Sequence, residues 1–505
     1  MYILSAQQLK VWDQYTIIHE PIASLQLMER AAQKCTDWII EKKWQEFSFS
    51  IFCGKGNNGG DGLAIARLLL LNQYTVSIYI LETGSKGSED FQANLQRLHE
   101  LPLADIHYLQ SAEHFPVLSK NQILVDALFG YGLNKSLSGL AADLVNHLNQ
   151  SGSVIVSIDL PSGLYVDRSS KGNPVIRANY TLSFECYKLA LLVQENAEYI
   201  GEVHILPIGL HAGYFNEKDI STQLITKEDI RQLYRARNPF AHKGEFGHSL
   251  LIAGSYGKMG AAVLAARACL HSGTGLLTCY LPKCGYVVMQ TAVPEAMVLT
   301  DENENMLTQL PDEIEKYDAI GIGPGIGTSE PTQRLISFMV RRYQKPLVID
   351  ADGLNCISMH PELLKQLPPF SIITPHPKEF DRLTHHHEND FERIEAAREM
   401  ARSHKIIVVL KGHHTLVAMP GGSAWFNSTG NAGMAKGGSG DVLTGIITSF
   451  VAQRYEPVAA ALLGVYLHGC AGDAAAVSLG ETFILPSELI GYLPAAFSSL
   501  ETTGT

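Results

Sequence analysis

Short apolar runs of strand length alternate with longer helix-like runs along almost the whole chain. The first half contains FSIFCG (Phe49–Gly54), VSIYIL (Val76–Leu81) and VIVSIDL (Val154–Leu160), and the second repeats the pattern with SLLIAGS, AIGIGPG and PLVIDADG. This alternation is typical of parallel sheets with helices packed on their faces. We therefore predict an α/β fold with two domains. The N-terminal domain is expected to be a Rossmann-like three-layer αβα domain, and a second αβα domain is expected to follow it.

A chain of 505 residues is longer than one ordinary domain. The two series of strand signals are separated by GLHAGYFNEKDIS (Gly209–Ser221), which has neither a strand nor a helix period. After it, Thr226 can cap a helix with Asp229 three residues further on. We predict two domains, residues 1–212 and 222–500.

Composition excludes several classes of function. The net charge is -12 and the basic residues are scattered, so we expect no nucleic-acid partner. The first residues lack the pattern of a secretory signal, and apolar runs such as Ile406–Leu410 are of strand length, so we expect no membrane partner. The eight cysteines contain no C-x-x-C pair and are expected to be reduced thiols of a cytoplasmic protein.

The densest motif in the second half is a glycine-rich loop, Asn431–Asp441, followed by the apolar run VLTGIITSFVAQ. Glycines let backbone N–H groups approach an anion closely, and the start of a helix adds unpaired amides. Phosphate would repel the Asp441 carboxylate, so its sensible role is to take a proton from an attacking hydroxyl. On its own, the same pattern could be a turn with a helix-capping aspartate.

Three further loops support a ligand site. Gly254–Gly260, Gly323–Gly327 and Lys411–Thr415 each follow an apolar strand run. Loops that follow parallel strands share one crevice at the carboxyl ends of the strands. None of them matches G-x-x-x-x-G-K-[ST], so the predicted nucleotide site is not a P-loop.

The first half has its own glycine loop, Gly54–Gly62, between a strand and a helix. It matches G-x-G-x-x-G, and Glu82 ends the next strand, as in a dinucleotide-binding dehydrogenase. That alternative is weak, because Asp61 would repel a pyrophosphate.

Polar side chains also follow the strands of the first half. The oxygens of Asn58, Asp126 and Ser162, with Asp159, are hard ligands suited to an alkali or alkaline-earth cation. Taken singly, each aspartate could instead cap the turn after its strand.

The second half resembles the ADP/ATP-dependent NAD(P)H-hydrate dehydratase family, a branch of the ribokinase-like superfamily. The resemblance covers about Thr226–Leu493 and rests on NAGMAKGGSGDVLTG, KGHHT, GIGPGIG and HKGEFGHSLLIAGS. It implies that ADP or ATP phosphorylates the hydroxyl of the (6S)-hydrate, that Asp441 is the base, and that Mg²⁺ binds on the nucleotide phosphates. It also implies that the nucleotide contacts Lys411, Gly412, His413, His414, Thr415 and Gly440, and the hydrate contacts Ala261, Gly325, His376 and Asp441. His376 stands where ribokinase-like enzymes have Asn in the motif N-x-x-E, so the role of Glu379 is left open. The role of Asp352 is also left open.

The first half is similar to the NAD(P)H-hydrate epimerase family over about Ser5–Leu210, through LMERAA, GNNGGDG, VDALFGYGL and SIDLPSGL. The similarity implies that Asp159 is the acid–base group that interconverts the R and S hydrates at C6. It implies a K⁺ site at Asn58, Asp126 and Ser162. It implies substrate contacts from Asn57, Asn58, Gly59, Gly60, Asp61, Gly130, Tyr131, Gly132, Leu133, Asn134, Lys135, Ser136 and Asp159.

Both halves in this order resemble the bifunctional NAD(P)H-hydrate repair family, in which the epimerase supplies the epimer that the dehydratase uses. The expected small-molecule partners are NADHX or NADPHX and ADP or ATP, and a homo-oligomer is expected. The alternative is a ribokinase-like vitamin or sugar kinase with a non-catalytic N-terminal binding domain.

Overall fold

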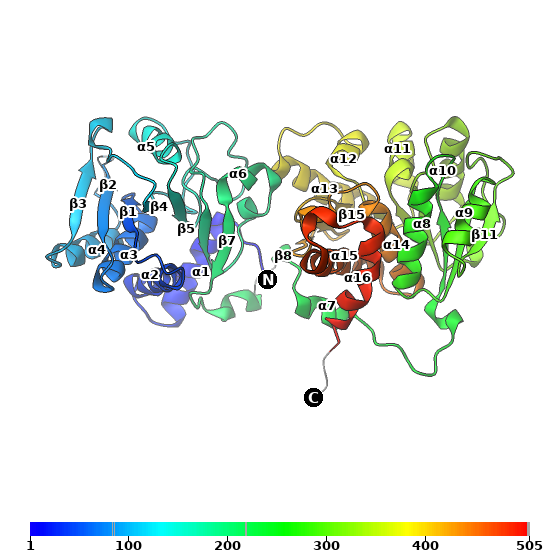
Figure 1. Ribbon diagram of the computed structural model, residues 1–505, viewed down its shortest axis with the longest axis horizontal. Coiled ribbons are helices and arrows are strands. Elements are labelled where there is room, and N and C mark those ends of the chain that lie inside the picture. Colours follow the sequence, from blue (N-terminus) through cyan, green and yellow to red (C-terminus); the bar gives the residue numbers. More distant parts are fainter. Residues whose placement is uncertain (83, 85, 218–219, 502–505) are drawn as a thin grey trace. The chain divides into compact units, whose positions relative to one another are not determined.

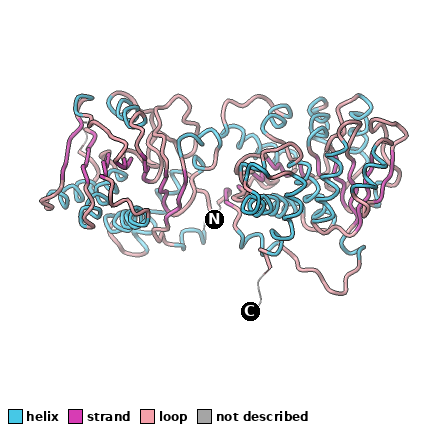
Figure 2. Tube along the Cα trace, in the orientation of Figure 1, coloured by secondary structure: helices cyan, strands magenta, loops and turns pink. Residues whose placement is uncertain are grey.

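The computed structural model describes residues 1–82, 84, 86–217 and 220–501. They divide into two compact units. One comprises the described residues of Tyr2–Ile220 with Asn389–Phe391, and the other comprises those of Ser221–Glu388 and Glu392–Thr505 with Met1. Each unit alternates strands and helices around one sheet (Figures 1 and 2), which confirms the predicted α/β class. Lys218 and Asp219, in the stretch where we predicted the domain boundary, lie outside the described residues.

The N-terminal unit contains a seven-stranded sheet in the order β3-β2-β1-β4-β5-β6-β7. All its strand pairs are parallel. The strands are β1 Ser48–Cys53, β2 Val76–Leu81, β3 Asp105–Leu109, β4 Gln122–Ala127, β5 Val154–Ile158, β6 Tyr180–Phe184 and β7 Glu202–Leu206. The order reverses at β1, which pairs with β2 on one side and β4 on the other. A crevice is expected there, at the carboxyl ends of β1 and β4.

Helices cover both faces of this sheet. Neighbouring residues of a strand point to opposite faces, so Ile51 packs into the core under α3, whereas Phe52 joins Leu144 and Leu148 of α5 in the other layer. The helices are α1 Ala6–His19, α2 Ser24–Glu41, α3 Asn57–Leu71, α4 Glu89–His99, α5 Leu140–Asn149 and α6 Ala197–Ile200. The unit is therefore the predicted three-layer αβα structure.

The C-terminal unit contains a ten-stranded sheet in the order β11-β10-β9-β12-β13-β14-β15-β16-β17-β8. It is parallel except for the β15–β16–β17 meander. The strands are β8 Thr222–Leu224, β9 His248–Ile252, β10 Leu276–Leu281, β11 Met297–Thr300, β12 Ala319–Ile322, β13 Leu347–Ile349, β14 Ile372–Ile373, β15 Ile407–Leu410, β16 Leu416–Ala418 and β17 Ala424–Phe426. This order reverses between β9 and β12, where a second crevice is expected.

The helices of the C-terminal unit begin with α7 Lys227–Leu233, whose Thr226–Asp229 capping box confirms the prediction from sequence. The others are α8 Met259–His271, α9 Gly285–Ala292, α10 Glu330–Arg342, α11 Ala351–Met359, α12 Pro377–Leu383, α13 Asp390–His404, α14 Ser439–Ala452, α15 Pro457–Leu479 and α16 Pro486–Ser498. Every residue of α14 from Val442 onward is buried, because α8, α15 and the sheet surround it.

One helix in the described part of the chain, α15, is long and apolar enough to cross a membrane. This helix is longer than the apolar runs of strand length, such as Ile406–Leu410, from which we expected no membrane partner. Of its most apolar 18-residue window, 67% is buried inside the protein, the pattern of a core helix.

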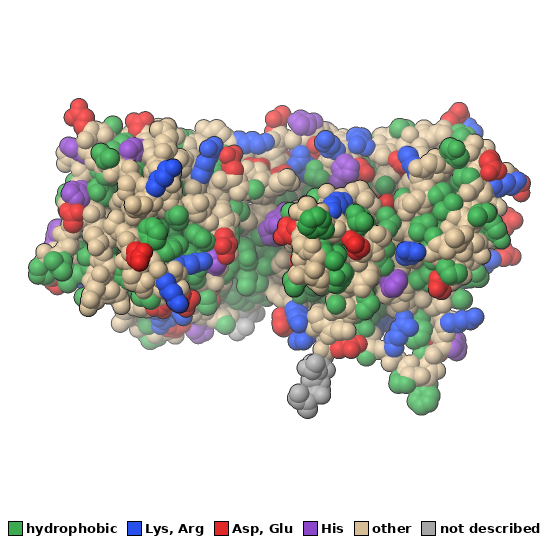
Figure 3. All heavy atoms as spheres, viewed as in Figure 1, with side chains coloured by type: hydrophobic (Ala, Val, Ile, Leu, Met, Phe, Trp, Pro, Cys, Tyr) green, Lys and Arg blue, Asp and Glu red, His purple; other side chains and the backbone are tan. Residues whose placement is uncertain are grey.

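Charged side chains of both signs are interspersed on the face shown in Figure 3. Lysine and arginine do not gather there over any one element. This view agrees with the scattered basic residues of the sequence.

The close packing of α14 on α8 predicts that Gly445→Ala destabilises the C-terminal unit. A Cβ at Gly445 would lie 2.2 Å from the Ala265 carbonyl oxygen, so one helix must move. We expect a loss of about 1–3 kcal/mol in unfolding free energy, measured by denaturant titration. Gly491→Ala in α16 is the matched control: a Cβ there meets nothing within 4 Å, so the helix gains stability. Equal effects of the two substitutions would contradict the close packing.

Candidate functional sites

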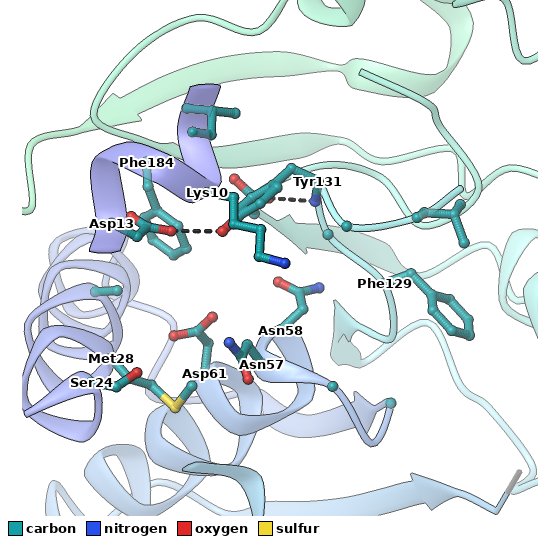
Figure 4. A pocket seen from close by; sticks show the side chains of 18 of the residues that line it. Lys10, Asp13, Ser24, Met28, Asn57, Asn58, Asp61, Phe129, Tyr131 and Phe184 are labelled. Carbon is teal, nitrogen blue, oxygen red and sulfur yellow. Dashed lines mark hydrogen bonds between the residues drawn. The ribbon is translucent and has the colours of Figure 1, made fainter. Parts of the chain in front are cut away.

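A cavity of about 990 Å³ opens at the carboxyl ends of β1, β4 and β5 in the N-terminal unit (Figure 4). Its wall combines the start of α3, the loop after β4, the residue after β5, and side chains from α1 and α2. Ten predicted substrate contacts line it: Asn57, Asn58, Asp61, Gly130, Tyr131, Gly132, Leu133, Asn134, Lys135 and Asp159. Gly59, Gly60 and Ser136 do not line the cavity. A Cβ at Gly59 would lie 1.7 Å from the Gly54 carbonyl oxygen, so this glycine lets α3 start against the loop that follows β1.

Asp159 is held in this cavity by three separate constraints. Its φ is +67°, a left-handed conformation that is costly for a residue with a side chain and recurs at functional sites. Its Oδ2 accepts a hydrogen bond from the Tyr131 backbone N–H at 2.9 Å. Its Oδ1 lies 3.0 Å from the Nζ of Lys188, and both side chains are buried. Lys188 also donates to the Ser183 hydroxyl at 2.8 Å, so it is fixed from two sides.

Two further carboxyl groups face the same cavity. The Tyr131 hydroxyl donates to Asp13 Oδ2 of α1 at 2.6 Å (Figure 4). Burial raises the pKa of Asp13 to about 6, against the lowering effect of the Tyr131 hydrogen bond. Burial, and then the charges of Asp159 and Asp13, raise the pKa of Asp61 well above its ordinary value. The cavity can therefore hold both ionised and protonated carboxyl groups near neutral pH.

The residues predicted to bind a cation fall into two adjacent groups. Asp126 and Ser162 are bonded to each other: the Ser162 hydroxyl donates to Asp126 Oδ1 at 2.5 Å and the Ser162 N–H donates to Oδ2 at 2.8 Å. Asp126 also accepts the Leu128 N–H at 3.3 Å, so it caps the turn after β4 as well. Asn58 lies beside Gly130, where a Cβ would be 3.2 Å from its Oδ1. Both amide atoms of Asn58 are buried without a hydrogen-bond partner, which is costly for a polar group and points to a ligand.

Sequence reasoning missed Asp13 and Lys188. Asp13 lies in the helical stretch QQLKVWDQYTII, which contains no motif that marks a site. The second stands in the apolar run CYKLALLV, where a lysine needs a buried acid as its partner. That isolated charge was the signal that could have found it.

The buried ion pair predicts a large loss of stability for Lys188→Met. Removal of the lysine leaves Asp159 buried without its cation, at a cost of about 3–5 kcal/mol in unfolding free energy. A second change, Asp159→Asn, should recover part of this loss. The control is Arg177→Met, which breaks the exposed Arg177–Glu198 pair of the same unit and should cost at most about 1 kcal/mol. Equal losses for the two single variants in thermal unfolding would contradict the account.

In the C-terminal unit, Asp441 lies in the first turn of α14, directly after the glycine loop. The loop enters the helix through Gly438, whose φ of +102° requires glycine. Burial and then the charge of Asp350 raise the pKa of Asp441 to about 7, while the Lys411 ammonium lowers it. A carboxylate with this pKa can accept a proton at neutral pH.

Lys411 joins the glycine loop to the end of β13. Its Nζ lies 2.7 Å from Asp350 Oδ1, and the Thr444 hydroxyl of α14 donates to Asp350 Oδ2 at 2.8 Å. A Cβ at Gly440 would lie 3.3 Å from the same Nζ. The structure thus brings together Lys411, Gly440 and Asp441. Gly412, His413, His414 and Thr415 form the turn between β15 and β16, where the Thr415 hydroxyl donates to the Gly412 carbonyl oxygen at 3.2 Å.

Two of the predicted hydrate contacts also meet. Gly325, with a φ of +65°, follows β12, and a Cβ there would lie 3.2 Å from the Ala261 Cβ of α8. Asp352, whose role the sequence left open, holds this loop, because its Oδ2 accepts the Gly327 N–H at 2.9 Å and lies 3.1 Å from Lys258 Nζ.

His376 is the N-cap of α12. Its Nδ1 accepts the Lys378 N–H at 3.1 Å, and its own N–H donates to Glu379 Oε2 at 2.9 Å. Burial lowers the pKa of His376, whereas the charge of Glu379 raises it. Glu379 lies 3.9 Å from Lys411 Nζ and so connects His376 to the lysine. Within the described residues, no group of three or more His, Cys, Asp or Glu side chains could hold a metal ion.

Comparison with known proteins accounts for both units. The family described as NAD(P)H-hydrate dehydratase matches residues 249–495, and the family described as YjeF-related protein N-terminus matches residues 24–190. A bifunctional NAD(P)H-hydrate repair enzyme of Moorella thermoacetica is 34% identical, over 99% of this chain and 97% of its own. Its counterpart in Escherichia coli is 31% identical over 88% of this chain and 84% of its own.

The chain belongs to the family of bifunctional NAD(P)H-hydrate repair enzymes.

A solved structure extends the comparison for the C-terminal unit. The ADP/ATP-dependent NAD(P)H-hydrate dehydratase of Bacillus subtilis, co-crystallised with ATP and Mg²⁺, is 32% identical. It matches with a TM-score of 0.50, covering 56% of this chain and all of its own. The repair family therefore carries a dehydratase and an epimerase domain in this order, and the alternative of a vitamin or sugar kinase with a passive N-terminal domain is not better supported.

Proposed function

We propose that the N-terminal cavity interconverts the R and S hydrates of NADH and NADPH, and that the C-terminal site dehydrates the S form at the expense of ADP or ATP. The observation that carries the proposal is the position of Asp441, a largely buried carboxyl in the first turn of a helix that begins with a glycine loop. Such a helix start binds phosphate, and a carboxylate beside it has no role as a phosphate ligand.

The dehydration begins with a proton transfer. Asp441 takes the proton of the C6 hydroxyl as that oxygen attacks the terminal phosphate of the nucleotide. The C6–O bond of the resulting phosphate ester then breaks, the proton at C5 passes to the departing phosphate, and the C5=C6 double bond of the dihydropyridine ring is restored. Lys411 and the amides of the glycine loop lie beside Asp441 and offset the negative charge of the phosphates during transfer. Gly325 lies against Ala261 with no room for a side chain of its own, and these two residues are the proposed contacts of the hydrate.

Mg²⁺ fits this site as a companion of the nucleotide. The described residues offer no cluster of three or more acidic or histidine ligands, and Mg²⁺ is commonly bound by substrate phosphates with one or two carboxylates. When bound, it would neutralise charge on the phosphates. Glu379, 3.9 Å from Lys411, is the carboxylate we assign near the metal. The Bacillus subtilis relative, which is described as ADP/ATP-dependent and was co-crystallised with ATP/Mg²⁺, supports the proposed nucleotide and Mg²⁺, and the place of Glu379 beside them is our proposal.

In the N-terminal cavity, Asp159 is the acid–base group of the proposed epimerase, because its carboxylate reaches the cavity while Lys188 and Tyr131 fix its position. Asn58, Asp126 and Ser162 are the proposed K⁺ ligands, supported by the buried Asn58 amide that has no protein partner. When bound, K⁺ would offset the negative charge of the Asp126 carboxylate. We also propose a cytoplasmic location and a homo-oligomeric assembly.

The base assignment predicts that Asp441→Asn lowers dehydration of the S hydrate by about 10²–10⁴-fold, since the amide cannot take the proton. Recovery of the reduced-nicotinamide absorbance, with Mg²⁺ and either ADP or ATP, measures this loss. Interconversion of R and S hydrates, followed by chromatography, should continue at the wild-type rate. Undiminished dehydration by this variant would contradict the role of Asp441.

The pKa of Asp441 sets the pH dependence of dehydration. Only the ionised carboxylate is a base, so kcat/KM should rise about tenfold per pH unit below about pH 7 and level off above it. Removal of the nearby cation in Lys411→Met removes the effect that lowers the pKa, so the midpoint should move to higher pH. A flat profile between pH 5 and 8 in the wild type would refute the assignment.

A further inference from the structure

Of the three carboxyl groups that the described residues place at the cavity of the N-terminal unit, one, Asp13, is assigned by neither the sequence motifs nor the family comparison. Asp13 lies on α1, before residue 24, where the matching N-terminal family begins. It lines the same cavity as Asp159 and Asn58. Figure 4 shows its side chain directed toward Tyr131 across the mouth of the cavity.

Helix α1 places Asp13 firmly. Ser5 and Gln8 form a capping box at its start, and its apolar face, Leu9 with Trp12, is buried in the core of the unit. The Trp12 indole N–H donates to the His211 carbonyl oxygen at 3.0 Å, which ties the helix to the segment after β7. Asp13, next to Trp12 in the chain, is therefore positioned by buried contacts.

Tyr131 connects the two carboxyl groups. Its backbone N–H donates to Asp159 Oδ2 at 2.9 Å, and its hydroxyl donates to Asp13 Oδ2 at 2.6 Å. Tyr131 thus fixes both acids, Asp159 through its backbone and Asp13 through the end of its side chain. Their surroundings differ: Asp159 has the buried Lys188 ammonium at 3.0 Å, whereas no Lys or Arg of the described residues forms an ion pair with Asp13. Two carboxyl groups in unlike surroundings divide acid and base roles between them.

We propose that Asp13 is the general acid of the epimerase site and works with Asp159 as the base. This inference rests on the proposed function of the N-terminal unit. Asp13 gives its proton to the C6 hydroxyl, the C6–O bond breaks as the N1 lone pair forms the N1=C6 bond, and water leaves. A water then adds to C6 from the other face, its proton passes to Asp159, and the electron pair returns to N1.

The reaction needs no oxidant or reductant, because no atom of the substrate has a different oxidation state at the end. One proton leaves Asp13 and one arrives on Asp159, and the substrate keeps its formula. Exchange with water in the open cavity returns the proton from Asp159 to Asp13 between turnovers. In the reverse reaction the two groups exchange roles: protonated Asp159 is the acid and the ionised Asp13 carboxylate is the base.

The test is Asp13→Asn in the full-length chain. The amide oxygen can still accept the Tyr131 hydrogen bond, so the fold and the KM for the hydrate should hold within about threefold, whereas kcat for R-to-S conversion should fall about 100-fold or more. Dehydration of the pure S hydrate reports that the C-terminal unit is folded, and the thermal unfolding of the variant, compared with that of the wild type, reports the same for the N-terminal unit. Asp37→Asn, an exposed acid on α2, is the matched control and should leave both activities unchanged.

The Tyr131→Phe variant provides a second, independent test of the role of Asp13. The hydrogen bond from its hydroxyl lowers the pKa of Asp13, so its removal raises that pKa. The protonated acid then persists to higher pH, and the alkaline limb of the epimerisation profile should move upward. The other groups that face Asp13 are Asp61 on α3, Asp159, Lys188 and, from its own helix, Lys10. They are unchanged in this variant.

Wild-type kcat in Asp13→Asn, or an unshifted alkaline limb in Tyr131→Phe, would overturn the role of Asp13 and leave the proposed function standing. A loss in Asp13→Asn that lies in KM alone would also overturn it, because that result indicates a binding role. No R-to-S conversion by the wild-type protein would refute the epimerase function itself, and this inference with it.

Discussion

The strands of a parallel sheet all end at one edge, and that edge opens where the strand order reverses. Both units are built on this constraint. In the N-terminal unit the reversal lies between β1 and β4, and the cavity forms from the loops that follow them. In the C-terminal unit it lies between β9 and β12, and the loops after these strands hold Ala261 and Gly325 together. The order of the strands thus sets where each site lies, and the side chains of the loops set its chemistry.

Each site then gathers several carboxyl groups around a lysine. In the first cavity, Asp13, Asp61 and Asp159 share the buried Lys188; in the second site, Asp350, Asp352 and Asp441 lie within electrostatic reach of Lys411 and Lys258. Burial raises the pKa values of Asp13, Asp61 and Asp441, which form no ion pair as close as those of Lys188 with Asp159 and Lys411 with Asp350. In the proposed reactions, such an arrangement supplies a proton acceptor and a proton donor for chemistry at C6 of the hydrate.

Much of this could be predicted from the sequence. Strand length, glycine loops and the Thr226–Asp229 capping box follow from local rules, and the structure has them where predicted. The meeting of Asp126 with Ser162 was also foreseen, because both follow strands of one parallel sheet. Their mutual hydrogen bonds were not foreseen, since side-chain pairing depends on rotamers that no motif encodes.

Other features depend on contacts between distant segments. Asp13 enters the first cavity only because α1 packs on the segment around His211, about 200 positions later. Lys188 pairs with Asp159 across a loop, and Asp352 holds the loop at Gly327. The hydrophobic periodicity of the sequence indicates helices and strands, but it does not indicate which distant side chains pair. Ser136, which the family pattern placed at the substrate, is exposed and does not line the cavity.

The central claim is that two separate sites, one in each unit, act in turn on a hydrate that moves between them. Complementation in solution tests it most directly: the Asp441→Asn and Asp159→Asn variants are mixed and given the pure R hydrate with Mg²⁺, K⁺ and ADP or ATP. The account predicts that each variant alone restores reduced-nicotinamide absorbance slowly or not at all, and that the mixture restores it fully. A mixture no faster than the better single variant would contradict the claim that the two sites work independently.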